Sequence, residues 1–240
     1  MRRHSKGLLR RLWRLAWRLA LAVVLLSLAA VLVFRVVPLP GSMVMVERKV
    51  QSWLAHEPLS IDYRWRGRSA LSDTARIAVI AAEDQRFPRH GGFDFIELRR
   101  ALAARLNGER LRGASTLSQQ TAKNVFLWSG RSWLRKGLEA WFTLLIELLW
   151  GKQRILDVYL NVAEWDRGVF GLEAAAQHYF GVSASRLDVR QASLLAAILP
   201  SPLTRSAATP SPDVAQRSRW IRRQMGNLGG TGYLERLTQP

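Results

Sequence analysis

The stretch Ala81–Asp94, AAEDQRFPRHGGFD, decides how the rest of the chain is interpreted. The apolar residues before it predict a helix, and this helix ends in two adjacent carboxylates, Glu83 and Asp84, ahead of a break rich in proline and glycine. A carboxylate at the end of a hydrophobic helix is desolvated on one side, which raises its pKa and suits it to act as a general base. Ordinary solvated acids, with Asp94 capping the next helix, explain the pattern equally well.

The stretch Gly113–Asn124, GASTLSQQTAKN, predicts a turn followed by a helix that Ser115 or Thr116 opens. Backbone N–H groups at the N-terminus of a helix form an anion site. A capped and solvated helix is the alternative explanation. Spacings of four residues place amides and an ammonium on one broad face: Gln119 with Lys123, and Gln120 with Asn124.

The stretch Arg135–Glu139, RKGLE, leads into a segment that is apolar on nearly all sides. Within it, Glu139, Thr143 and Glu147 recur at intervals of four and form one polar stripe along a buried helix. Polar groups on such a helix must be paired or face a cavity. A structural ion pair accounts for Glu147, whereas the two cations beside Glu139 leave positive charge for an anionic ligand.

The stretch Lys152–Asn161, KQRILDVYLN, predicts another helix with mixed faces, and Gly168, Gly171 and a run of alanines follow it. Small residues allow helices to pack closely. We therefore interpret this region as structural, with the exception of Lys152.

Helical patterns dominate from residue 73 onward, so the sequence predicts a mainly α domain. Residues 43–54 fit a short amphipathic helix, residues 61–65 alternate like a strand, and the last ten residues are expected to be frayed. The expected helices cover 73–87, 94–107, 116–127, 132–150, 152–161, 171–180, 188–198 and 211–227. The expected N-caps are Ser72, Asp94, Thr116, Ser132 and Asp188, and Thr116 with Gln119 has the spacing of a capping box.

An uncharged run of sixteen residues, Leu19–Phe34, predicts a membrane-spanning helix. If the side chain of Arg35 snorkels, the run extends to Val37 and covers nineteen residues, or ~28 Å of helix. Seven cations precede the run, so the positive-inside rule places the N-terminus in the cytoplasm and everything after Pro38 outside. The alternatives are a cleaved signal peptide and a buried core helix. No convincing A-x-A site follows the run, and a core helix would not need flanking cations.

The composition restricts the chemistry. The absence of cysteine excludes disulfides, thiolate zinc sites and cysteine nucleophiles. The net charge is +18, and 28 basic and 18 acidic residues remain outside the anchor region, an excess of ten that favours a polyanionic partner. The chain has 31 arginines but only five lysines, and three of these lysines, Lys123, Lys136 and Lys152, lie in the stretches above. A compact ammonium therefore has a specific use there.

Together, the four stretches resemble the conserved motifs of the peptidoglycan glycosyltransferases, the family shared by monofunctional enzymes and bifunctional penicillin-binding proteins. The resemblance covers roughly residues 73–203 and is closest to the monofunctional type, because no Ser-x-x-Lys of a transpeptidase half is found. E-D-x-x-F-x-x-H-x-G-x-D is matched by Glu83, Asp84, Phe87, His90, Gly92 and Asp94; G-x-S-T-x-x-Q-Q by Gly113, Ser115, Thr116, Gln119 and Gln120; R-K-x-x-E by Arg135, Lys136 and Glu139; and K-x-x-I-x-x-x-Y-x-N by Lys152, Ile155, Tyr159 and Asn161.

The resemblance implies a lysozyme-like helical domain with a small membrane-embedded jaw, preceded by one transmembrane helix. Its implied reaction is the polymerisation of lipid II: the 4-hydroxyl of the acceptor attacks the anomeric carbon of the growing, lipid-pyrophosphate-linked chain. Glu83 would be the general base. Glu139 would assist at the donor end, with or without a divalent cation (Mg²⁺ or Mn²⁺), and no organic cofactor is expected. The substrate and its pyrophosphate would be held by Lys123, Arg135, Lys136, Lys152, Ser115, Gln119, Gln120 and Asn124, with support from Asp84, Phe87, His90, Asp94 and Thr116.

The expected organisation is a basic cytoplasmic segment (1–18), the transmembrane helix (19–37), a juxtamembrane linker (38–72), the glycosyltransferase domain (73–228) and a tail (229–240). The catalytic domain would face the outside of the cytoplasmic membrane. Its expected partners are lipid II, the lipid-linked glycan, the membrane and cell-division or elongation proteins, but not nucleic acid. Two other classes share some of these features: a lytic transglycosylase or lysozyme-like hydrolase, and a membrane-tethered polyanion-binding protein.

Overall fold

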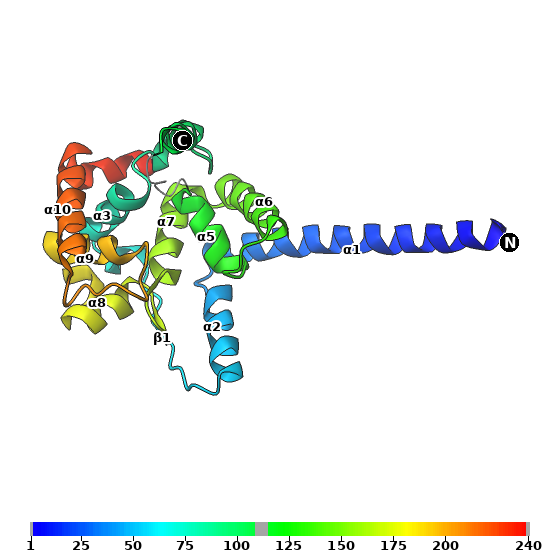
Figure 1. Ribbon diagram of the computed structural model, residues 1–240, viewed down its shortest axis with the longest axis horizontal. Helices are drawn as coiled ribbons and strands as arrows, with labels where there is room; N and C mark the ends of the chain where they lie inside the picture. Colours follow the sequence, from blue (N-terminus) through cyan, green and yellow to red (C-terminus); the bar gives the residue numbers. More distant parts are fainter. Residues whose placement is uncertain (1, 109–114, 239–240) are drawn as a thin grey trace. The chain divides into compact units, whose positions relative to one another are not determined.

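The computed structural model describes residues 2–108 and 115–238, and the chain divides into two compact units, residues 1–38 and 39–240. The first unit holds one helix, α1 (Arg2–Val36), drawn in blue in Figure 1. Residues 10–36 of α1 are long and apolar enough to cross a membrane. The membrane segment predicted from the sequence, 19–37, lies almost wholly inside this helix.

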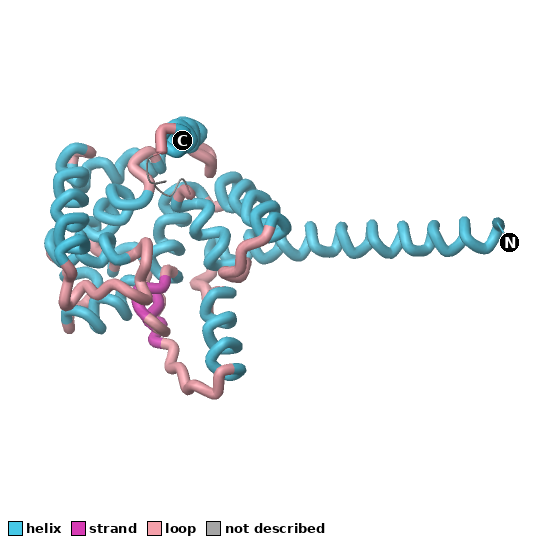
Figure 2. The backbone as a smooth tube through the Cα atoms, in the orientation of Figure 1, coloured by secondary structure: helices cyan, strands magenta, loops and turns pink. Residues whose placement is uncertain are grey.

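The second unit consists mainly of helices, and Figure 2 shows a small region of strands among them. The prediction of a mainly α domain is therefore confirmed. The helices are α2 (Met43–Leu54), α3 (Asp73–Glu83), α4 (Phe95–Leu106), α5 (Leu117–Phe126), α6 (Trp133–Leu149), α7 (Gly151–Val162), α8 (Leu172–Phe180), α9 (Val189–Ile198) and α10 (Pro212–Asn227). Short 3₁₀ helices are η1 (Arg68–Ala70), η2 (Phe87–Arg89), η3 (Ala184–Arg186) and η4 (Gly230–Leu237).

The helix starts follow the predicted caps. The side chains of Ser72, Asp94, Thr116, Ser132 and Asp188 each accept a hydrogen bond from a backbone N–H in the first turn of the helix that they open. Thr116 and Gln119 also form the predicted capping box. The predicted end of the first of these helices at residue 87 is wrong, because α3 ends at Glu83. Asp84 leaves the helix with φ −159° and ψ 77°, and its carboxylate accepts hydrogen bonds from other elements, as described below.

The core forms around α3, which packs against α9, α10 and η4, whereas α5 packs against α6 and α7. The side chains of Ile77 and Ile80 in α3 are almost completely buried, as are Phe87, Tyr159 and Trp165. Burying side chains of this size supplies most of the driving force for folding. Because α3 lies in the core, the carboxylates at its C-terminal end are held in a fixed position.

The three short strands form one small sheet. Strand β3 (Val169–Phe170) pairs in parallel with β1 (Asp62–Tyr63) and antiparallel with β2 (Glu164–Asp166). The predicted strand at 61–65 is therefore present but shorter. Gly168 and Gly171 both have positive φ, and a Cβ on either one would lie 2.4 Å and 2.6 Å, respectively, from a backbone oxygen. The close packing predicted for this region is confirmed.

The C-terminal residues are packed rather than frayed as expected, at least over η4. Tyr233 and Leu237 are buried, and the hydroxyl of Tyr233 donates a hydrogen bond of 2.6 Å to the backbone oxygen of Gln85. The expectation failed because the three glycines of this segment suggest a flexible end, whereas the contact that holds it is with Gln85, 148 residues away in the sequence.

Candidate active site

Glu83, the last residue of α3, has each of its two carboxylate oxygens held by a different helix. The side-chain amide of Gln120 in α5 donates to Oε2 at 3.0 Å, and the guanidinium of Arg217 in α10 lies 3.5 Å from Oε1. Burial raises the pKa of Glu83; Gln120 and Arg217 oppose this effect, and the neighbouring Asp84 adds to it. A buried carboxylate with a raised pKa has the properties of a general base.

A second hydrogen bond orients the amide of Gln120. The hydroxyl of Tyr159 in α7 donates to Oε1 of Gln120 at 3.1 Å, so that the amide nitrogen is directed at Glu83. Burial raises the pKa of Tyr159 well above its ordinary value, and the hydroxyl therefore remains a donor. This contact joins the first, second and fourth sequence stretches at Glu83.

Asp84 joins the first two stretches structurally. Its carboxylate oxygens lie 3.0 Å from Nε2 of His90, and one of them accepts from the backbone N–H of Leu117 at 3.0 Å. The hydroxyl of Thr116 donates to the backbone oxygen of Gly92 at 2.6 Å. The carboxylate of Asp84 thus lies at the N-terminus of α5, and Thr116 caps the helix, as the alternative of a capped helix predicts.

The remaining predicted residues of the second stretch have different surroundings. Gln119 is buried in the capping box, where its side chain accepts from the backbone N–H of Thr116. Ser115 is exposed and Asn124 is half-buried. Gly113 lies outside the described residues.

A cationic cluster, defined here as Lys123, Arg135 and Lys136, surrounds Glu139. Arg135 Nη1 lies 2.7 Å from Glu139 Oε2, Lys136 forms an ion pair with the other oxygen, and Glu139 is only 3% exposed. Within the described part of the chain, no hydrogen bond or ion pair engages the side chain of Lys123.

The pKa of Lys123 is lowered, first by burial and then by the positive charges of Arg135 and Lys136, whereas Glu139 and Glu83 oppose the change. The ammonium of Lys123 therefore interacts electrostatically with both carboxylates that the sequence predicts to be functional. A desolvated ammonium that no carboxylate contacts directly within the described residues is suited to bind an anion.

Lys152 has other partners. Its ammonium lies 2.7 Å from Glu147 Oε1 and 4.6 Å from the centre of the Phe87 ring, and it donates to the backbone oxygen of His90. The hydroxyl of Ser118 donates to the same oxygen of Glu147. These contacts tie Lys152 to the first and third stretches and do not involve the cationic cluster.

Replacing Glu147 with alanine is expected to lower the free energy of unfolding by about 3–5 kcal/mol, because the mutation leaves the buried ammonium of Lys152 without its counter-charge. Chemical denaturation of the purified protein measures this loss. Glu57→Ala is a matched control, since the ion pair of Glu57 with Arg167 is exposed and contributes little. A loss for Glu147→Ala no larger than that of the control would contradict a structural role.

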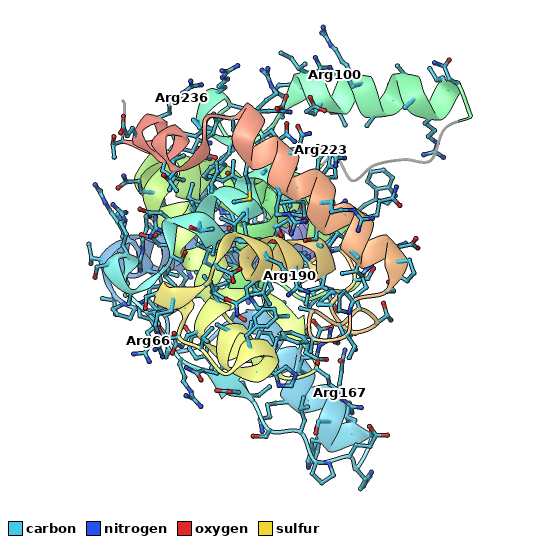
Figure 3. The ribbon with its side chains drawn as sticks, turned by 90° about the vertical axis from the view of Figure 1, so that its left-hand side faces the viewer. Arg66, Arg100, Arg167, Arg190, Arg223 and Arg236 are labelled. Carbon is cyan, nitrogen blue, oxygen red and sulfur yellow. The ribbon has the colours of Figure 1, made fainter. Side chains whose placement is uncertain are left out.

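The sequence did not predict the contribution of α10 to this site. Glu83, Arg217 and Trp220 line a cleft of about 770 Å³, together with Arg100 of α4 and Arg223 of α10. Figure 3 shows the helices that carry Arg100 and Arg223. The signal that could have pointed to α10 is the high density of arginine in residues 217–223. In a chain with such an excess of basic residues, this density did not single out the segment.

The carboxylates of the site do not fit a metal ion in their present arrangement. Both oxygens of Glu139 are engaged by Arg135 and Lys136. Ligand atoms of Asp84, His90 and Asp94 lie within 4.8 Å of one another. However, Asp84 already binds His90 and a backbone N–H, and Asp94 binds Arg86 and two backbone N–H groups.

Comparisons with known proteins show the family to which the chain is similar. The family described as Transglycosylase matches residues 60–226. A protein of Chromohalobacter salexigens named biosynthetic peptidoglycan transglycosylase is 68% identical over 212 residues, which cover 88% of this chain and 91% of that protein. A protein of Pseudomonas aeruginosa with the same name is 60% identical over 233 residues, which cover 97% of this chain and 98% of that protein.

The family match includes all four sequence stretches and extends into α10, which supplies Arg217 to the cleft. The helical architecture is consistent with the lysozyme-like fold expected from the resemblance. The chain belongs to the transglycosylase family.

Proposed function

We propose that this chain is a peptidoglycan glycosyltransferase that polymerises lipid II into glycan strands. The observation that carries the proposal is the position of Glu83: a buried carboxylate with a raised pKa, at the wall of a cleft and in electrostatic contact with Lys123. The names of the relatives support the same reaction.

In the proposed step, the O–H bond of the acceptor 4-hydroxyl breaks and its proton passes to a carboxylate oxygen of Glu83. The electron pair of the hydroxyl oxygen forms the new bond to the anomeric carbon of the donor. The bond between that carbon and the pyrophosphate breaks, and the leaving group takes the electron pair. A base is needed at one end of this reaction and positive charge at the other.

The cationic cluster supplies the positive charge. Three cations face one carboxylate, Glu139, so a net positive charge remains for a pyrophosphate. We propose that Lys123 makes the direct contact, because Arg135 and Lys136 are already paired. Lys152 is then a structural residue, and Ser115 and Asn124 remain predicted substrate contacts.

A divalent cation remains a proposal, and among the described residues neither Glu139 nor the group of Asp84, His90 and Asp94 offers free ligand atoms for it. A metal ion at Glu139 would have to displace Arg135 or Lys136 from the carboxylate. We therefore derive no step through a metal ion.

The membrane-embedded jaw is best assigned to α4. This helix has no buried residue, and the apolar side chains of Phe95, Leu98, Leu102 and Leu106 are at least half exposed. Figure 3 shows α4, which carries Arg100, as a helix that projects from the rest of the unit. Such a surface is suited to contact lipid.

Turnover of purified lipid II distinguishes the proposed function from the two other classes. A glycosyltransferase releases the lipid pyrophosphate and forms a longer glycan. A hydrolase or lytic enzyme shortens an existing glycan, and its uncharged leaving group has no use for the cationic cluster. A polyanion-binding protein converts neither substrate.

We also propose that α1 anchors the protein in the cytoplasmic membrane with the N-terminus inside. Seven cations precede Leu19 and no acidic residue does, so retention of this end in the cytoplasm is favoured. A C-terminal reporter that is active only in the cytoplasm is expected to stay silent, whereas the same reporter at the N-terminus should be active. An active C-terminal fusion would contradict the topology.

A further inference from the structure

Arg217 reaches Glu83 from a helix that belongs to none of the four stretches. Its Nη2 lies 3.5 Å from Oε1 of Glu83 and donates to the backbone oxygen of Ala82 at 3.3 Å. The side chain of Arg217 is 34% exposed, whereas that of Glu83 is 12% exposed. Arg217 and Glu83 both line the cleft, and Arg217 is the more exposed of the two.

The packing of α10 fixes the position of Arg217. The adjacent Ser218 is buried and forms a hydrogen bond of 2.7 Å with Ser193 of α9, while Val214 and Ile221 lie in the core. The guanidinium also lies at the C-terminal end of α3, where backbone carbonyls lack helical partners and the helix dipole is negative. A cation is stabilised there even when Glu83 is neutral.

We propose that Arg217 is a positioning residue for Glu83: together with Gln120 it orients the carboxylate and keeps it ionised, and therefore able to accept the proton of the acceptor hydroxyl. This inference rests on the proposed function and assigns a role to a residue outside the four motifs. Gln120 binds one oxygen as a neutral donor, and Arg217 provides charge at the other.

The charges around Glu83 oppose one another. Asp84 raises the pKa of Glu83 and Arg217 lowers it, while Lys123 of α5 and the buried hydroxyl of Tyr159 of α7 also interact with Glu83. Lys123 would be engaged by the pyrophosphate during the reaction. Arg217 is then the cation that continues to favour the ionised form of the base.

The test is the pH dependence of kcat/KM for lipid II polymerisation. A base with a raised pKa loses activity as the pH falls through that pKa. Arg217→Gln removes the cation, so the acidic limb of its profile is expected to move to higher pH by about one unit. Arg217→Lys keeps the charge and should move the limb less. Arg219→Gln, on the same helix but exposed, is the matched control and should leave the limb in place.

A direct titration of the Glu83 carboxyl group, by isotope-edited infrared spectroscopy, gives a readout that does not depend on turnover. The pKa of Glu83 should rise in Arg217→Gln. If the wild type is active, two results would overturn the positioning role. The first is a pKa of Glu83 and an acidic limb in Arg217→Gln that equal those of the wild type. The second is a loss of rate in Arg217→Gln that is the same at every pH. Failure of the wild type to polymerise lipid II would overturn the proposed function. If Arg217→Gln does not fold, Arg217→Lys replaces it in both measurements. A small shift of its acidic limb to higher pH would support the positioning role, and an unchanged limb and pKa of Glu83 would overturn it.

Discussion

Replacing Glu83 with glutamine is expected to reduce the polymerisation of lipid II by roughly 10²- to 10⁴-fold, the usual contribution of a general base. The substitution preserves the size of the side chain and an oxygen that can accept from Gln120, so the orientation of the site should survive. Because burial of the carboxylate disfavours its charged form, the amide should leave the melting temperature unchanged or raise it. Steady-state polymerisation rates and thermal unfolding of the same preparation measure both effects.

Glu235→Gln is the control for this substitution, since Glu235 is an exposed acid on η4. Its rate should equal that of the wild type. Polymerisation by Glu83→Gln at the wild-type rate would show that another group accepts the proton. Asp84 is poorly placed for that task, because His90 and the N-terminus of α5 already engage its carboxylate.

Replacing Lys123 is expected to have the second large effect. Removal of a positioned donor to a developing anion costs roughly 10²- to 10³-fold in kcat, and Lys123→Met should lose about this much. Lys123→Arg keeps the charge, but the planar guanidinium is broader than the ammonium and imposes bidentate geometry, so we expect most of the turnover to be lost. Because arginine retains the positive charge, the substitution should preserve the long-range attraction to the pyrophosphate better than it preserves kcat.

The pH profile adds a second measurement for Lys123. Its lowered pKa means that the ammonium loses its proton at a lower pH than an ordinary lysine does, and wild-type activity should decline at correspondingly lower pH. Any residual activity of Lys123→Arg should lack this alkaline decline, because arginine stays protonated. A decline that persists unchanged would assign the alkaline limb to another group.

Lys136→Arg provides a graded comparison. The side chain of Lys136 is 45% exposed and already pairs with Glu139, so a larger cation is easier to accommodate there and the loss of rate should be smaller. Arg190→Lys is the control, since Arg190 is exposed on α9 (Figure 3). Wild-type rates for both lysine variants would show that charge alone is sufficient.

The sequence by itself determined the helical class, the apolar segment now found in α1 and nearly all the helix starts. The cap of α3 by Ser72 and the capping box of Thr116 with Gln119 depend on contacts between residues three positions apart. Such contacts form within one helical turn, so the local sequence contains all the information that they need. The polar stripe of Glu139, Thr143 and Glu147 could be predicted for the same reason.

Only the tertiary structure decided which of the motif residues act together. Glu83 meets Gln120, which is 37 residues away, and Arg217, which is 134 residues away. Lys152 pairs with Glu147 and not with the cationic cluster, and the N-terminus of α5 is occupied by Asp84. These contacts depend on how α5, α7 and α10 pack around α3. Helical periodicity specifies which face of each helix is buried, but it does not specify which other face will lie against it.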